Sequence, residues 1–485
     1  MNYLELLRLA APEAIVVVTA LIVLALGLTK SERTTAAAAV VAALGLAVAV
    51  LAVLRLPPHA DFFHGMLVIS PLNSLFQIIC LVLAFFTVLL AHGDRVARHH
   101  GEYLALILFA TVGLLLLVGS EELLMIFIGL ELTGLSLYVM AAFDRSDQRS
   151  AEAGLKYFLF GSTASAFTLF GISLIYGLAG TTGLAAIAQA IGELPIPPLL
   201  AAGVVMTLIG FAFKVAVAPF HLWAPDVYQA APVPTAAFIA SGSKVASFVV
   251  LGKIVLVGFA PLHGSADWHA LVAGWSPLLA ILAAFSILLG NLVALAQRNV
   301  RRLLAYSAVA HAGYTLLGLV AGGPDGFSAT LFYTTIYAIT LVGAFGVVAL
   351  VRQETGGDDF SNFAGLRARS PLLAGCMAIF MLSLAGLPPL AGFFGKFYLF
   401  SVALRSGENH GLLWLVALAL FGSLISLYYY LLVLKVIFVD EAKAGDLIIE
   451  PGFLQQVALG VLAAGIIALG LIPEPLVARI ATVLH

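Results

Sequence analysis

Long apolar runs recur along the whole chain, and short stretches in which charged residues, glycine or proline cluster separate one run from the next. A helix needs roughly 20 apolar residues to cross the ~30 Å hydrocarbon core of a bilayer. The pattern therefore predicts an all-α polytopic membrane protein with about fourteen transmembrane helices. The expected spans are 12–29, 35–54, 70–91, 102–119, 122–142, 152–179, 199–222, 234–258, 276–296, 302–320, 328–351, 371–404, 411–438 and 454–472.

Proline interrupts two of these spans. Pro219 lies inside the span 199–222, while the span 371–404 is too long for a simple crossing and contains Pro388 and Pro389. A proline inside a helix removes one backbone hydrogen bond and bends or ends the helix. The sequence therefore predicts a broken helix at each position.

The two predicted breaks lie about five spans apart, which suggests two related halves of about five helices each. A repeat with an odd number of spans must be inverted across the membrane. Because the gaps between spans are too short to build a soluble domain, we expect a single membrane domain. Its expected parts are N-terminal helices over about 1–100, a first five-helix repeat over about 101–258, a second over about 276–438 and a C-terminal helix over about 454–485.

Composition supports this class. The 485 residues are 62% hydrophobic and only 10% charged, whereas soluble domains usually have about 25% charged residues. The net charge of −2 and the lack of basic runs interleaved with aromatic residues give no support for nucleic-acid binding. Cys80 and Cys376 lie in separate apolar runs, so this chain alone cannot supply a four-cysteine iron–sulfur or zinc site.

Lysine and arginine are distributed unevenly between alternate loops, with fourteen in one set and four in the other. Cytoplasmic loops carry the excess of basic residues in membrane proteins. We therefore expect a multi-pass protein of a bacterial inner membrane with both termini on the periplasmic side. The run at 15–28 follows an acidic start and lacks a small-residue cleavage pattern, so it is interpreted as the first span.

Four ionisable residues lie inside predicted spans. Glu131 is near the middle of the fifth span, and Lys214 lies inside the seventh, five residues before Pro219. Lys244 lies in the eighth span and Lys396 in the twelfth, after the second break. Each such charge costs about 2.5–3.5 kcal/mol at a helix centre on insertion scales. An intramembrane ionisable residue is therefore interpreted as functional, and these four predict a proton path.

Pro219 also suggests how Lys214 could exchange protons. The carbonyl near Val215 loses its helical partner, which gives water a place to enter. A carboxylate nearby favours the charged form of a buried lysine, so a changing distance to Glu131 would make Lys214 a switchable proton holder. In a continuous helix His221, seven residues on, would share a face with Lys214, although Pro219 weakens that argument.

Other candidates have simpler explanations beside the functional one. Lys156, near the start of its span, either joins the path or extends to the membrane surface, and Lys253, near an outer end, is expected to extend to that surface. His311 is either part of the path or a hydrogen-bonded core residue. The histidine pairs 59/64 and 99/100 lie at loop positions where spacing alone is weak evidence for a metal, so none is predicted.

Motifs for nucleotide-driven or redox chemistry are not found in the sequence. It contains no P-loop, and the glycines of "GLAGTTGLAA" lack the strand–turn–helix context of a dinucleotide site. Any redox chemistry is therefore expected in another chain.

Five stretches closely resemble the antiporter-like membrane subunits of respiratory complex I. In chain order over about 100–435 they are "GLELTGLSLYVMAAF", "SAEAGLKYFLFGSTASAFTLFG", "FKVAVAPFHLWAPDVYQAAPVPTAAFIASGSKVASF", "QRNVRRLLAYSAVAHAGY" and "MLSLAGLPPLAGFFGKFYLF". The antiporter-like subunits of this family are of N, M and L types. With a lysine after the second break and without a long lateral helix, the sequence resembles the N type more than the other two.

The resemblance implies fourteen spans, two inverted repeats with a broken helix in each, and a proton path formed by Glu131, Lys214, Lys244 and Lys396. It also implies partners, namely the other membrane and peripheral subunits of the complex. No cofactor is expected in this chain, and flavin, iron–sulfur clusters and quinone are expected in the partner subunits. Two alternatives stay open: a subunit of a multisubunit sodium/proton antiporter, or a structural membrane subunit that does not pump.

Overall fold

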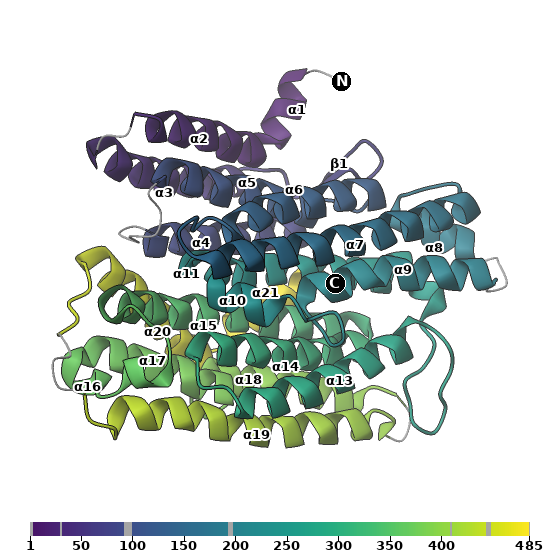
Figure 1. Cartoon of the computed structure of the whole chain (residues 1–485). Helices are drawn as coiled ribbons and strands as arrows, with labels where there is room; N and C mark the ends of the chain where they lie inside the picture. Colours follow the sequence, from purple (N-terminus) through teal and green to yellow (C-terminus); the bar gives the residue numbers. More distant parts are fainter. Residues whose placement is uncertain are drawn as a thin grey trace. The chain divides into compact units, whose positions relative to one another are not determined.

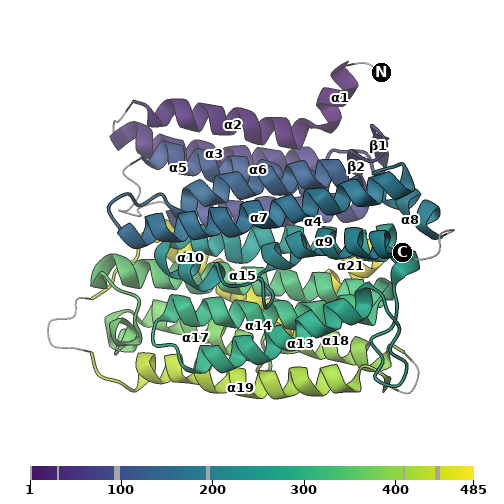
Figure 2. The ribbon, with the colours of Figure 1, turned by 45° about the vertical axis from the view of Figure 1, so that its right-hand side comes forward.

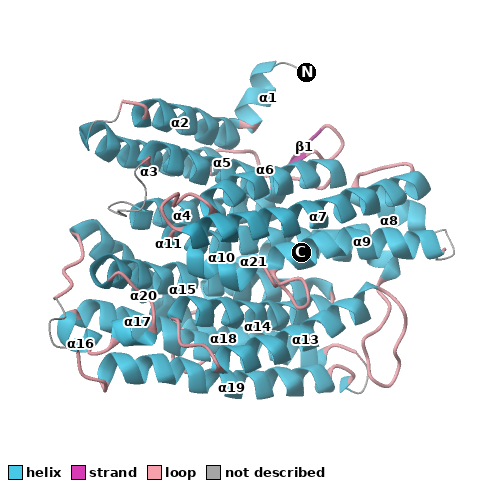
Figure 3. Cartoon of the chain, viewed as in Figure 1, coloured by secondary structure: helices cyan, strands magenta, loops and turns pink. Residues whose placement is uncertain are grey.

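The computed structural model describes residues 3–29, 32–91, 99–192, 197–407, 410–442 and 448–484, most of them helical (Figure 3). Their contacts divide the chain into two compact units. Unit 1 comprises Met1–Lys214 and Gly242–His263, and unit 2 comprises Val215–Ser241 and Gly264–His485.

The fourteen predicted spans all coincide with apolar helical segments. Within the described residues, twelve segments are long and apolar enough to cross a membrane, and Ala11–Gly27 and Pro371–Ala385 are shorter apolar helices at the first and twelfth predicted positions. The fold is therefore that of a polytopic helical membrane protein. Four of the fourteen basic residues assigned to the cytoplasmic loops lie outside the described residues, namely Lys30, Arg95, Arg98 and Lys443.

Unit 1 contains the N-terminal helices α1 to α9, which Figure 1 labels, together with α12. Its α-helices are α1 (Tyr3–Leu9), α2 (Ala11–Gly27), α3 (Glu32–Val53), α4 (Pro71–Ala91), α5 (His100–Val118), α6 (Leu123–Ala141), α7 (Gln148–Ala179), α8 (Leu184–Gly192), α9 (Pro198–Val215, whose last residue belongs to unit 2) and α12 (Lys244–Lys253). A short antiparallel hairpin, β1 (Ala60–Phe62) with β2 (Leu67–Ile69), joins α3 to α4. The hairpin and α8 were not predicted.

Small residues let the helices of unit 1 pack closely. Helix α2 packs on α3 and α5, and α5 packs on α6 (Figure 2). A Cβ atom added at Gly101 would lie 2.3 Å from the Cα of Gly27, and one added at Gly113 would lie 2.7 Å from the backbone nitrogen of Thr133. Such close backbone approach is typical of membrane helices, whose association depends on packing rather than on the exclusion of water.

Unit 2 contains the C-terminal helices. Its α-helices are α10 (Ala224–Ala230), α11 (Val233–Phe238), α13 (Trp275–Leu295), α14 (Val300–Ala321), α15 (Gly323–Thr355), α16 (Leu366–Arg369), α17 (Pro371–Ala385), α18 (Ala391–Arg405), α19 (Leu413–Phe438), α20 (Phe453–Leu471) and α21 (Glu474–Leu484). Helices α14 and α15 are buried along most of their length, and α13, α17, α18, α19 and α20 pack around them.

Both predicted helix breaks are present. Helix α9 ends at Val215 and α10 begins at Ala224, with Pro219 between them. Helix α17 ends at Ala385 and α18 begins at Ala391, so the second break contains both Pro388 and Pro389. Each break leaves backbone groups without their helical partners, where side chains or water can bind them.

The eighth predicted span has an irregularity that hydropathy did not indicate. Helix α12 lies between two π-helical turns, η1 (Ile239–Ser243) and η2 (Ile254–Gly258). Lys244 is the first residue after η1, and Lys253 is the last before η2. Such turns are rare and occur frequently at functional sites.

Arg301 corrects one assumption about the loops. It was counted among the cytoplasmic loop residues, but its side chain is 1% exposed. Its guanidinium donates hydrogen bonds to the carbonyls of Tyr228, at 2.7 Å, and of Ala231, and it lies 3.4 Å from the carboxylate of Asp358. Arg301 therefore holds the C-terminal end of α10 in place within unit 2.

Candidate functional site

The first candidate site, in unit 1, joins residues from three helices. Glu131 projects from α6, Ser165 from α7 and Lys214 from the last turn of α9. The Ser165 hydroxyl donates a hydrogen bond to the Glu131 carboxylate, and Glu131 and Lys214 line the same small cavity. Lys214 is only 5% exposed. The structure thus brings together the acid and the base that were predicted to act as a pair.

A small cavity lies between these groups. Its volume is about 20 Å³, which is enough for one water molecule. Its walls are formed by Phe127, Leu130, Glu131, Tyr138, Ala164, Ser165, Thr168, Gly210, Phe213 and Lys214. A single water here would lie in a cavity that both ionisable side chains line.

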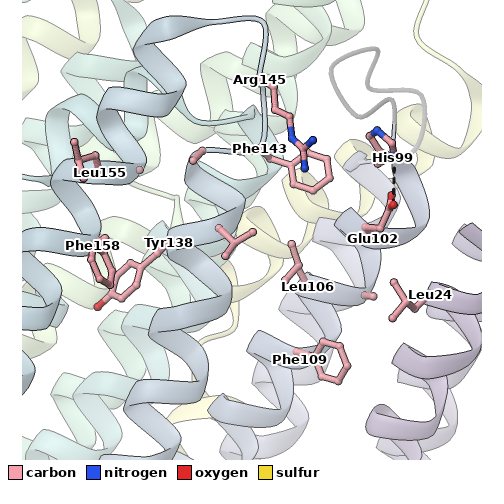
Figure 4. Close-up of a pocket in the computed structure, with 14 residues that line it drawn as sticks. Leu24, His99, Glu102, Leu106, Phe109, Tyr138, Phe143, Arg145, Leu155 and Phe158 are labelled. Atoms are coloured by element: carbon pink, nitrogen blue, oxygen red, sulfur yellow. Dashed lines mark ion pairs between the residues drawn. The ribbon is translucent and has the colours of Figure 1, made fainter. Parts of the chain in front are cut away.

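Tyr138 also lines a second, larger pocket of about 670 Å³ in unit 1 (Figure 4). Helices α2, α5, α6 and α7 supply its mainly apolar walls, which include Leu106 and Phe158. On one side of it, Nδ1 of His99 lies 3.2 Å from a carboxylate oxygen of Glu102. The close approach of Tyr138 to α7 depends on Gly161, where an added Cβ would lie 2.0 Å from the tyrosine hydroxyl.

Lys244 is buried at the start of α12 and is 2% exposed. On the same segment, the hydroxyls of Ser241 and Ser247 donate to backbone carbonyls four residues earlier, each at 2.6 Å. Their oxygens can still accept a hydrogen bond, so they remain able to solvate a cation.

The second break positions Lys396 in unit 2. Its ammonium donates hydrogen bonds to the carbonyl of Ala385 at 3.1 Å and to the hydroxyl of Ser423 at 2.9 Å. It also lies 5.4 Å from the centre of the Tyr314 ring, within the range of a cation–π contact. Because Ala385 ends α17, its carbonyl points from the negative end of that helix, which favours a cation. The break therefore creates the binding site of the lysine.

His311 is the centre of a buried hydrogen-bonded chain in unit 2. Its Nδ1 lies 2.7 Å from the hydroxyl of Tyr333, and its Nε2 lies 3.0 Å from that of Tyr430. The Tyr430 hydroxyl also shares a hydrogen bond with Ser307. The imidazole ring stacks on Tyr337, with 4.8 Å between ring centres. A histidine with a hydroxyl on each nitrogen can relay a proton by exchanging tautomers.

The hydrogen-bond partners of His311 were not predicted from the sequence. A second series of hydrogen bonds was not predicted either, and it runs from Tyr314 through Asn291 to Tyr429, with lengths of 2.9 and 3.0 Å. The available signal was the tyrosine run at 428–430 within an apolar span, because buried tyrosine hydroxyls need hydrogen-bond partners.

His221 lies in the first break, in unit 2, and is 4% exposed. Since α9 ends at Val215, the seven-residue spacing does not place His221 on the helical face of Lys214. Its Nδ1 has no hydrogen-bond partner among the described residues, so this nitrogen is available to a water molecule. The ring of Tyr306 meets it edge-on, 6.4 Å between centres.

Two further lysines of unit 1 differ in their environment. Lys156 is 39% exposed and pairs with Glu152 at 2.6 Å, one turn earlier on α7. Lys253 was expected to extend to the membrane surface, and this prediction is wrong, because the side chain is 3% exposed. Acceptors from α4 and from the end of α5 surround its ammonium inside the protein, so it does not need to reach water.

Within the described ranges, no group of three or more His, Cys, Asp or Glu side chains is placed to hold a metal ion. Cys80 and Cys376 are both buried free thiols.

Comparison with known proteins connects these sites to a family. Residues 120–426 match the family model described as NADH:quinone oxidoreductase/Mrp antiporter, transmembrane. NADH-quinone oxidoreductase subunit N 2 of Acidobacterium capsulatum is 45% identical over 486 residues, which cover 98% of each chain. A chain of respiratory complex I from Thermus thermophilus with bound aureothin matches with a TM-score of 0.79 at 33% identity, covering 96% of this chain and 98% of that one.

A chain of the Mrp complex from Dietzia sp. matches with a TM-score of 0.86 over 99% of this chain and 97% of that one, but at 22% identity it shows the fold alone. The similarity to subunit N, in contrast, extends over the full length at high identity. The chain therefore belongs to the NADH:quinone oxidoreductase/Mrp antiporter transmembrane family, and within it to the subunit N group.

Proposed function

We propose that this chain is a proton-translocating membrane subunit of a multisubunit NADH:quinone oxidoreductase. The observation that carries the proposal is the pair of Glu131 and Lys214, which line one water-sized cavity within membrane-spanning helices. Quinone reduction takes place in partner subunits, which also hold the flavin and iron–sulfur clusters. This chain supplies the proton path.

The pair works as a switch. While the Glu131 carboxylate is close, it stabilises the Lys214 ammonium; when quinone reduction elsewhere in the complex weakens that interaction, the ammonium releases its proton to water. Water, His221 or Lys244 then accepts it, and Lys396 exchanges protons with the outside. Lys156 and His311 are further candidates for the path, and the hydroxyls on both His311 nitrogens support a relay role.

The proposal includes an orientation of the chain in the membrane. The excess of basic residues in one set of loops supports a bacterial inner-membrane protein with both termini on the periplasmic side. Two inverted five-helix repeats, each with one broken helix, would give each half of the path its own opened helix, around Pro219 and around Pro388 and Pro389.

A non-pumping scaffold is less consistent with the structure. Lys214, Lys244 and Lys396 are each at most 5% exposed. Buried charges are costly and a scaffold would be more stable with leucine at these positions.

Glu131→Gln tests the proposed switch. Glutamine keeps the size of the side chain and its bond with Ser165, but it carries no charge to stabilise the Lys214 ammonium. We expect proton transfer through this chain to fall by roughly a hundredfold, the low end for loss of a proton-transfer group. The measurement is protons pumped per quinone reduced by the assembled complex in sealed vesicles.

Asp144→Asn is the matched control, since it removes a carboxylate from the loop that follows the same helix. It should leave the ratio of protons to quinone unchanged. Wild-type coupling in Glu131→Gln would contradict the proposed switch.

Gly386→Ala tests whether the second break positions Lys396. The glycine has a φ of +84°, and an added Cβ would lie 2.9 Å from the Cδ of Lys396 and 3.4 Å from its Nζ. Gly356→Ala is the control, because this glycine has a φ of +71° but a Cβ there would meet no atom of the described residues within 4 Å. Both changes carry a similar backbone cost of about 1–2 kcal/mol.

We therefore expect both variants to lower the thermal stability of the complex to a similar extent, and only Gly386→Ala to lower the protons pumped per quinone. Equal coupling in the two variants would show that the position of Lys396 does not depend on this contact.

A further inference from the structure

The proposed proton path does not use the larger pocket of unit 1. Its volume of about 670 Å³ lies within the ~300–1,000 Å³ range of sites that bind small molecules. Helices α2, α5, α6 and α7 supply the walls, so the whole pocket lies within one unit. Its lining residues indicate the chemistry of the molecule that it takes.

The pocket begins where these four helices terminate together. Helix α2 ends beside the start of α5, where a Cβ added at Gly101 would lie 2.3 Å from the Cα of Gly27. Helix α6 ends beside the start of α7, where a Cβ added at Gly154 would lie 2.4 Å from the Cβ of Ala142. Residues 119–122 join α5 to α6 at the opposite end. Such an end of a membrane helix bundle lies at the level of the lipid head groups.

Away from this end the pocket is apolar. Phe109 lies seven residues after Glu102 on α5, about 10 Å along the helix axis, and Phe158 lies ten residues after the start of α7, about 15 Å along it. One leaflet of a bilayer contributes about 15 Å of hydrocarbon. Leu155 and Phe158 are 57% and 45% exposed, so the pocket opens on the surface of the unit. It therefore has the depth and the lining that suit an acyl chain.

Three ionisable side chains line the polar end of the pocket, namely His99, Glu102 and Arg145 (Figure 4). Among the described residues, no carboxylate lies within ion-pair distance of Arg145, whereas Arg149 pairs with Asp147 at 3.1 Å. A guanidinium binds phosphate oxygens through parallel N–H donors. Basic pockets between transmembrane helices are known sites for lipid head groups. Arg145 is therefore suited to the phosphate of a lipid.

Glu102 distinguishes between head groups. One of its carboxylate oxygens lies 3.2 Å from Nδ1 of His99, and the other is buried without a hydrogen-bond partner among the described residues. A buried carboxylate oxygen without a donor is costly, and an ammonium group would supply one. A second negative charge on the lipid would instead be repelled by Glu102. Arg145 and Glu102 together therefore match a head group with one negative and one positive charge.

We propose that this pocket binds a phospholipid with a phosphoethanolamine head group. The phosphate binds the guanidinium of Arg145, the ammonium binds the carboxylate of Glu102, and one acyl chain lies against the apolar walls. This site is additional to the proton path and does not depend on it, because lipid binding does not require the chain to pump.

The test uses the assembled complex in phosphatidylcholine vesicles that contain a small fraction of a phospholipid probe with a photoactivatable acyl chain. One probe is a phosphatidylethanolamine and the other is a phosphatidylglycerol. After illumination, mass spectrometry measures the probe attached to α5 and α7 at the pocket. The reference for non-specific lipid contact is the probe attached to α19, where Leu424 and Tyr428 are exposed.

Two variants remove the charges of the pocket one at a time. Arg145→Gln removes the guanidinium, and Arg149→Gln is its matched control, because Arg149 is an exposed arginine four residues later that does not line the pocket. Glu102→Gln removes the negative charge and keeps a side-chain oxygen of similar position.

We expect the phosphatidylethanolamine probe to label the pocket equally in the wild type and in Arg149→Gln. Labelling of Arg145→Gln should be about tenfold lower, the effect of losing one hydrogen bond between charged groups. The wild type should take up this probe roughly threefold more than the phosphatidylglycerol probe, the effect of one partly exposed ion pair. Glu102→Gln should remove the difference between the two probes.

Three results would overturn the proposal. Labelling of the wild-type pocket no stronger than that of α19 would show that no lipid binds there, and unchanged labelling of Arg145→Gln would show that the phosphate is not bound by this arginine. Labelling by phosphatidylglycerol that equals or exceeds that by phosphatidylethanolamine would contradict the ethanolamine head group. None of these measurements depends on pumping, so a failure of the proposed function would leave their outcomes unchanged.

Discussion

Replacing Lys396 by methionine is expected to stop proton transfer through the second half of the path. Methionine is similar in length but cannot carry a proton, and the Ala385 carbonyl and the Ser423 hydroxyl lose their shared donor. Loss of a proton-transfer group lowers the rate of proton transfer about a hundredfold or more. The number of protons pumped per quinone reduced should therefore fall by the number that this chain normally transfers.

The same substitution should not destabilise the protein strongly. Replacing a buried charge by an apolar side chain of similar volume is often neutral or stabilising. A normal melting temperature of the complex together with lost pumping would therefore separate the role of Lys396 in transport from a role in folding.

Lys396→Arg provides the decisive comparison. Arginine keeps a positive charge but does not release its proton, so it should be as defective as methionine if Lys396 carries protons. Wild-type pumping in Lys396→Arg would instead make this lysine a fixed charge.

The features that could be predicted from the sequence are those with a local signal. The length of the apolar runs determined the spans, and proline inside a span determined the breaks around Pro219 and Pro388. The pairing of Glu131 with Lys214 could be predicted because a lone charge within a span is costly and so requires a partner. The resemblance to a known family pointed to the same two residues.

The rest depends on contacts between distant parts of the chain. The acceptors around Lys253 come from residues 135 and 180 positions away, so its position near a span end suggested an exposed side chain instead. Tyr430 is 119 residues from His311, and hydropathy carries no signal for such a hydrogen bond. The π-turns that flank α12 also have no counterpart in the apolar pattern, because they change the backbone hydrogen bonding and not the composition.

Arg301 is another residue whose burial could not be predicted from its position in the sequence. A basic residue between two apolar runs is typical of a cytoplasmic loop, but this one is buried because the carbonyls of Tyr228 and Ala231 at the end of α10 and the carboxylate of Asp358 bind it. Position along the sequence could not reveal that set of partners.

Lys214→Met tests the central claim, that Glu131 and Lys214 form the switch of the proton path. Lys214 is buried and lines the same cavity as Glu131. Methionine at position 214 carries no charge, so the Glu131 carboxylate would no longer have a lysine ammonium as its partner. Lys435→Met, the same substitution in the last turn of α19 where the side chain is exposed, is the matched control.

The deciding measurement is the number of protons pumped per quinone reduced by the assembled complex in sealed vesicles. We expect Lys214→Met to remove the contribution of this chain, with transfer through it reduced about a hundredfold or more, and Lys435→Met to pump like the wild type. Quinone reduction and pumping at the wild-type rate and ratio in Lys214→Met would contradict the account.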